Sequence, residues 1–186
     1  MQHEPNECDT VIVIEPVVAP PVSTFIEMVS RKLRLAGRKP LVRASEYGAS
    51  TMTFKNVEEI VLYVLTTTEK LSAGAELGGY VFPTVVEIVD DAGGYVCDNH
   101  VVFFGIRNRH GREWVYTRFL GAGPVPSGLV DEISAAMTTV LTSRGSLGTE
   151  VSNDEFEAAR SVLHVVADGV ESAVTAGMFQ APKRQM

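Results

Sequence analysis

Hydrophobic residues gather most clearly in two runs between residues 99 and 121, which flank a polar tip at Arg107–Arg112. The runs are rich in Val, Phe, Trp and Tyr, and the tip contains Gly111, which can take backbone angles that other residues avoid. This pattern is typical of a β-hairpin. Strand-like runs at 80–90, 95–108 and 113–120 therefore predict an antiparallel meander over residues 80–120.

Apolar residues recur at helical spacing in three other stretches, which predicts helices at 24–36, 129–143 and 154–178. Thr24 and Glu27 have capping-box spacing, and Gly37 stands where the first helix should end. The third stripe resembles a heptad seam, which we interpret as packing within the domain. The three stripes are Phe25, Met28, Val29, Leu33 and Ala36; Val130, Ile133, Met137 and Val140; and Phe156, Ala159, Leu163, Val166, Val170 and Ala173.

Two segments are harder to assign. Residues 57–71 carry a helical stripe, and Asn56 with Glu59 can cap a helix, but the same stretch is rich in β-branched residues that suit a buried strand. We predict a helix there. Residues 40–45 and 50–55 are expected to form short strands around a turn at Tyr47 and Gly48.

Residues 10–22 form an apolar, β-branched arm interrupted by Pro16, Pro20 and Pro21. Proline excludes a helix here and favours extended chain. Such an arm either packs on its own domain or adds a strand to a neighbouring subunit. In the second case, the candidate subunit interface comprises Val11, Ile12, Val13, Ile14, Val17, Val18, Trp114 and Tyr116.

Together these elements predict an α+β fold. An antiparallel β-sheet is packed by the N-terminal helix and the two C-terminal helices, and a second subunit covers the face that these helices leave. The predicted organisation is an arm at residues 1–22, a single domain at 23–180 and a tail at 181–186.

Composition narrows the function classes. The chain has 186 residues, 45% of them hydrophobic, which is enough for one domain with a core. Its net charge of −7 repels nucleic acid and anionic membranes except at a local basic patch. Residues 1–9 carry three acids and no Lys or Arg, unlike a signal peptide, and the apolar run 11–22 is too short to span a bilayer. We therefore expect a protein of the cytoplasm or of an assembled particle, with no membrane partner.

The sequence offers little catalytic chemistry. The Gly121–Gly123 loop before a helix lacks the features of a phosphate loop, since Pro124 and Pro126 remove two backbone donors. Cys97 and the pair Asp98 and His100 point to opposite faces of a strand, so they form no nucleophile–base dyad. Two cysteines are too few for a disulfide framework or a structural zinc site. We predict no catalytic residues, no metal and no cofactor.

Basic residues concentrate at the end of the first helix and at the hairpin tip. This surface is either simply solvated or a patch for an anion or an acidic partner. Its members are Arg31, Lys32, Arg34, Arg38, Lys39, Arg43, Arg107, Arg109, Arg112 and Arg118.

The leading hypothesis from sequence is a non-enzymatic structural subunit of a homo-oligomer, such as a virion component, whose arm docks on a neighbouring copy. One alternative is a small acidic adaptor or chaperone that binds another protein. A less favoured one is nucleic-acid binding through the basic helix end and hairpin tip, which would weaken steeply with salt. An enzyme ranks last, because no set of nucleophile, base and oxyanion donors is apparent.

Overall fold

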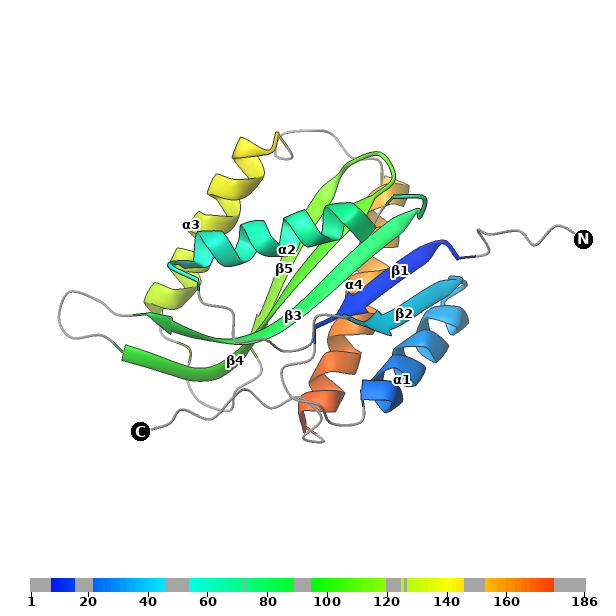
Figure 1. Cartoon of the computed structure of the whole chain (residues 1–186), viewed down its shortest axis with the longest axis horizontal. Helices are drawn as coiled ribbons and strands as arrows, with labels where there is room; N and C mark the ends of the chain where they lie inside the picture. Colours follow the sequence, from blue (N-terminus) through cyan, green and yellow to red (C-terminus); the bar gives the residue numbers. More distant parts are fainter. Residues whose placement is uncertain are drawn as a thin grey trace, which may run out of the picture.

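The computed structural model describes residues 8–15, 22–45, 54–71, 73–88, 95–119, 125, 127–145 and 153–175. In this part of the chain a five-stranded sheet and four helices form a mixed α+β fold (Figure 1). The elements are β1 (Thr10–Ile14), α1 (Val22–Leu35), β2 (Pro40–Ala44), α2 (Val57–Leu71), β3 (Leu77–Ile88), β4 (Tyr95–Asn108), β5 (Glu113–Phe119), α3 (Ser127–Ser143) and α4 (Asn153–Thr175).

The sheet has the order β2-β1-β3-β4-β5. Strands β3, β4 and β5 pair antiparallel, which confirms the predicted meander. Strand β1 is parallel to both β2 and β3, so the sheet is mixed and the purely antiparallel prediction is wrong. The reason is the connection: α1 and α2 are long enough to carry the chain back across the sheet, as a parallel pairing requires.

The described strand of the apolar arm, Thr10–Ile14, packs in cis. Ile12 faces Val42 of β2 on one side and Gly79 of β3 on the other, and Ile12, Val13 and Ile14 are buried. Because β1 is paired along both edges within its own sheet, it cannot supply a strand to a neighbour. This contradicts the docking arm for residues 11–14. Val17 and Val18 lie outside the described residues.

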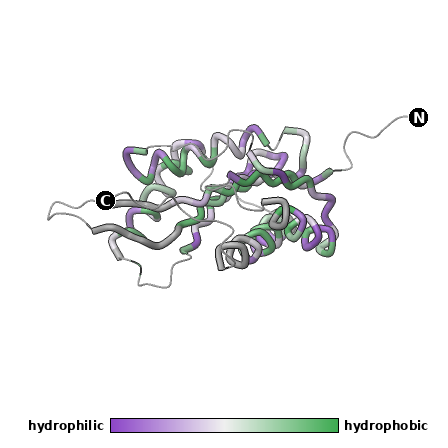
Figure 2. Tube along the Cα trace, turned by 60° about the horizontal axis from the view of Figure 1, so that its bottom comes forward, coloured by the Kyte–Doolittle hydropathy of each residue, from purple (hydrophilic) through white to green (hydrophobic). Residues whose placement is uncertain are grey.

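Each face of the sheet is covered by two helices of the same chain (Figures 1 and 2). Ile12, Ile14 and Phe104 pack with α1 and α4 on one face, whereas Val13 and Phe103 pack with α2 and α3 on the other. This alternation is the strand period of two. The prediction that a second subunit covers one face is therefore wrong.

Residues 57–71 are helical, as predicted, and the N-terminal cap explains why. The Asn56 side chain accepts a hydrogen bond from the Glu59 N–H at 2.9 Å, and the Glu59 carboxylate accepts one from the Lys55 N–H at 2.6 Å. These bonds satisfy donors that the first turn of a helix leaves free. The cap thus decides in favour of helix in a stretch whose β-branched residues also suit a strand.

Other boundaries differ slightly from expectation. Helix α1 begins at Val22, before the predicted cap at Thr24, and α3 begins at Ser127. Val130 is 42% exposed, so it does not belong to the buried stripe of α3. Of the predicted strand at 50–55, Phe54 and Lys55 are not in a strand, and the remainder lies outside the described residues, as does the loop at Gly121–Gly123. No described helix combines the length and apolar character needed to cross a membrane.

Candidate functional site

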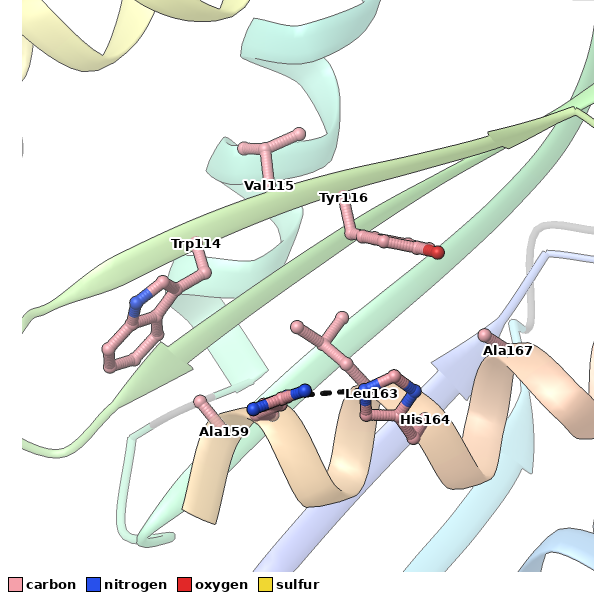
Figure 3. A pocket seen from close by; sticks show the side chains of 8 residues that line it. Trp114, Val115, Tyr116, Ala159, Leu163, His164 and Ala167 are labelled. Carbon is pink, nitrogen blue, oxygen red and sulfur yellow. Dashed lines mark hydrogen bonds between the residues drawn. The ribbon is translucent and has the colours of Figure 1, made fainter. Parts of the chain in front are cut away.

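A cavity of about 260 Å³ lies between the edge strand β5 and helix α4 (Figure 3). Trp114 and Tyr116 extend from β5 toward α4, whereas Val115 points to the other face, toward α2. The strand period of two places both aromatic rings on the same side. We call this cavity the β5–α4 pocket; it is lined by Trp114, Val115, Tyr116, Ala159, Arg160, Leu163, His164 and Ala167.

The β5–α4 pocket is apolar inside and cationic at its rim. Leu163, Ala159 and Ala167 supply aliphatic contacts from α4. Arg160 Nε lies 3.4 Å from His164 Nε2, so the guanidinium donates and the imidazole nitrogen accepts (Figure 3). The guanidinium supplies a permanent positive charge at this rim. Such a site can hold a planar apolar group of a ligand, and the guanidinium can pair with an acidic group on the same ligand.

A buried carboxyl marks the carboxyl end of β1. Glu15 is 4% exposed and accepts a hydrogen bond from the Tyr63 hydroxyl at 2.7 Å; that hydroxyl lies 3.0 Å from the hydroxyl of Tyr80. Burial raises the pKa of Glu15 above 4.5, although the Tyr63 hydrogen bond opposes the shift. The chain leaves β1 toward β2 on one side and returns to β3 on the other. Ligands of open α/β sheets bind at such switch points.

Four charged side chains join α2, the β4–β5 hairpin and the end of α3. Arg144 donates to Glu113 at 2.8 and 3.0 Å and to Glu69 at 3.0 Å. Arg107 lies 3.4 Å from both carboxylates. The hydrogen bonds to Glu113 raise the pKa of Arg144. We call this group the four-charge cluster and interpret it as structural, since Glu113 is only 5% exposed.

The hairpin tip and the end of α1 meet at one edge of the sheet. The Asp9 N–H donates to Lys39 O at 2.9 Å, the Glu76 N–H to Asp9 O at 3.0 Å and the Arg109 N–H to Glu76 O at 3.0 Å. These backbone bonds join the amino ends of β2, β1 and β3 to the tip. Arg34, Arg38 and Lys39 line an open groove at this edge, with Cys8 and Pro40.

Comparison with known proteins identifies no family. No protein-family model and no curated protein matches the sequence. One solved structure that is similar is a nucleoside-triphosphatase, a dITP/XTP pyrophosphatase, from Mycobacterium abscessus. It is 15% identical, with a TM-score of 0.34 over 75% of this chain and 98% of that chain. A likeness of this size carries no activity over to the present chain.

The prediction of a non-enzymatic structural subunit is nevertheless withdrawn. Its main premise, an arm that docks on a neighbouring copy, fails because β1 is paired within its own sheet. The accompanying expectation of no enzymatic activity is withdrawn with it.

The predicted site residues do not form one site but lie in several separate parts of the structure. Trp114 and Tyr116 line the β5–α4 pocket, while the proposed basic patch divides among several partners. Arg107 belongs to the four-charge cluster, and Arg118 lies 3.6 Å from Asp168 of α4. Arg31 and Arg43 are exposed on α1 and β2. Arg34, Arg38 and Lys39 line the groove at the edge described above, Arg109 and Arg112 belong to the hairpin tip, and Lys32 lies on α1.

Sequence reasoning missed Arg160, His164 and the network of Glu15, Tyr63 and Tyr80. The usable signal for Glu15 was an acid placed directly after a β-branched apolar run, since such runs are buried strands and their carboxyl ends bind ligands. Within the described residues, no three His, Cys, Asp or Glu side chains are placed to hold a metal ion. The side chains of Cys97, Asp98 and His100 lie outside the description.

Glu15→Gln is expected to change how stability depends on pH. The pKa of Glu15 is raised in the folded state, so its contribution to stability is fully present below about 4.5 and is lost as pH rises through the folded value. Glutamine cannot ionise, so the variant should gain stability relative to the wild type as pH rises above 4.5. Urea unfolding across this range measures the difference.

The control is Glu58→Gln, which removes an exposed carboxylate on α2 and leaves Glu15 in place. A difference between Glu15→Gln and wild type that stays constant with pH would show that burial does not control the ionisation of Glu15.

Proposed function

We propose that the chain binds a planar, mainly apolar small molecule that carries an acidic group, in the β5–α4 pocket. The observation that supports this most directly is the combination of two aromatic side chains, Trp114 and Tyr116, with an apolar floor and the Arg160 guanidinium at the rim. Ligand pockets are typically apolar with a few polar groups that fix orientation. Arginine suits a carboxylate, sulfonate or phosphate, because its fork can donate two parallel hydrogen bonds.

Naphthalene-2-sulfonate and uncharged 2-naphthol are suitable probes. The chain has one tryptophan, so the indole N–H of Trp114 gives a single reporter signal in a two-dimensional ¹H–¹⁵N spectrum. Titration with either probe is expected to shift this signal to saturation. Arg160→Gln should weaken sulfonate binding about five-fold, since it removes a charge-assisted contact, while binding of 2-naphthol stays within about two-fold.

Two variants control this experiment. Leu163→Phe fills the pocket with a larger side chain and should abolish binding of both probes. Arg31→Gln removes an exposed arginine on α1, outside the pocket, and should change neither affinity. An unmoved Trp114 signal at about 2 mM probe, a concentration that detects even weak binding, would refute the proposal. A signal that moves on dilution of the protein alone would instead assign the pocket to a second copy of the chain.

A further inference from the structure

The groove between α1 and β2 is built by the end of α1. The Arg38 N–H donates to Leu33 O at 2.9 Å and the Gly37 N–H to Arg34 O at 3.0 Å, while Gly37 has a φ of +84°. This is the Schellman arrangement, and it uses two carbonyls that would otherwise present partial negative charge. The turn brings Arg34, Arg38 and Lys39 around one hollow of about 600 Å³.

The charges in this groove are not balanced. Arg38 is held by Thr10 Oγ1 at 2.8 Å, and it lies 3.5 Å from each of the carboxylates of Asp9 and Glu76. In the described part of the chain, Arg34 and Lys39 form no ion pair, and both are exposed. Arg34 and Lys39 therefore stand outside these ion pairs, and the three basic residues exceed the two acids by one positive charge.

Arg38 also has an unused donor. Its Nη2 atom is buried and has no hydrogen-bond partner in the structure. Glu76 is near enough for charge attraction but, at 3.5 Å, too far for a good hydrogen bond. Buried donors are nearly always satisfied in native proteins, by protein atoms, water or a bound ion. Arg38 itself lines the groove, so an acceptor bound there would lie beside this guanidinium.

We propose that this groove binds a small phosphate-type anion. Arg34 and Lys39 supply the charge, and Arg38 adds a guanidinium that Thr10 anchors in the groove lining. A small anion fits better than a nucleic acid, because the net charge of −7 repels an extended polyanion, whereas a compact ion interacts mainly with the groove. The site is separate from the β5–α4 pocket and shares no residue with it.

Inorganic pyrophosphate is the probe, and isothermal titration calorimetry at low salt is the measurement. Arg34→Gln and Lys39→Gln should each weaken binding about five-fold, since each removes a charged contact. Arg31→Gln, on the same helix but outside the groove, and Arg160→Gln, in the other pocket, should leave the affinity within about two-fold. Affinity should fall when NaCl is raised from about 50 to about 300 mM.

Three outcomes would overturn the inference. The first is no binding of pyrophosphate at low salt. The second is an equal loss in Arg31→Gln, which would indicate diffuse attraction to the surface. The third is a single-stranded oligonucleotide that binds more than about ten-fold tighter than pyrophosphate and competes with it, which would assign the edge to a polyanion. Thermal melting of each variant confirms that the exposed substitutions leave the fold intact.

Discussion

Arg144→Met is expected to lower the free energy of unfolding by about 2–3 kcal/mol. The substitution removes the guanidinium that donates to both oxygens of Glu113, a carboxylate that is 5% exposed. Breaking a buried ion pair by removing one partner is costly because the remaining charge loses its compensation. Arg107 stays 3.4 Å from Glu113 and limits the loss. Urea unfolding measures the change.

Two further variants test this explanation. Removing both charges, in Arg144→Met with Glu113→Leu, should recover stability to within about 1 kcal/mol of wild type, since no buried charge is left alone. Arg160→Met breaks only exposed contacts, the pair with Glu157 at 3.8 Å and the hydrogen bond to His164 at 3.4 Å, and should cost less than about 0.5 kcal/mol. If Arg144→Met costs no more than Arg160→Met, the four-charge cluster does not stabilise the fold.

Gly105→Ala is expected to destabilise the protein by about 2–3 kcal/mol through overpacking. A Cβ atom at this position of β4 would lie 2.5 Å from Thr68 Oγ1 and 2.8 Å from Val64 Cγ1, both on α2. Neither neighbour can easily move, because Thr68 is fully buried and its hydroxyl donates to Val64 O at 2.7 Å. Thermal and urea unfolding measure the effect.

Gly79→Ala is the matched control on the neighbouring strand. Its Cβ would meet the end of the flexible Ile12 side chain at 2.7 Å, which can move aside, so the expected cost is below about 1 kcal/mol. Thr68→Ala should partly rescue Gly105→Ala, because it removes the closest atom. If Gly79→Ala and Gly105→Ala lower the free energy of unfolding equally, or if adding Thr68→Ala to Gly105→Ala recovers no stability, the close contact between α2 and β4 is contradicted.

Local signals predicted the elements well. The β4–β5 hairpin follows from Gly111, which has a φ of +84°, and from Asn108, whose side chain accepts hydrogen bonds from the N–H groups of His110 and Arg112. The cap at Asn56 decided the helical state of α2. In each case the deciding groups lie within a few residues of one another, so the sequence carries the information directly.

Partners across the sheet could not be predicted in the same way. The apolar run of β1 indicates a strand buried on both faces, but nothing in its sequence indicates that β2 and β3 are the strands that pair with it. The β5–α4 pocket has the same difficulty: strand alternation places Trp114 and Tyr116 on one face, but the helix that covers them begins at Asn153. Arg160 and Trp114 therefore meet only through the tertiary fold.

The central place of β1 also bears on synthesis of the chain. Ile12 pairs with Gly79, which a ribosome adds 67 residues later. At roughly 5–20 residues per second, this strand waits about 3–13 s for that partner, with its β-branched side chains uncovered. During this interval β1 lacks the strand that covers its second edge in the folded sheet, so slowing elongation before β3 should increase aggregation more than slowing it afterwards.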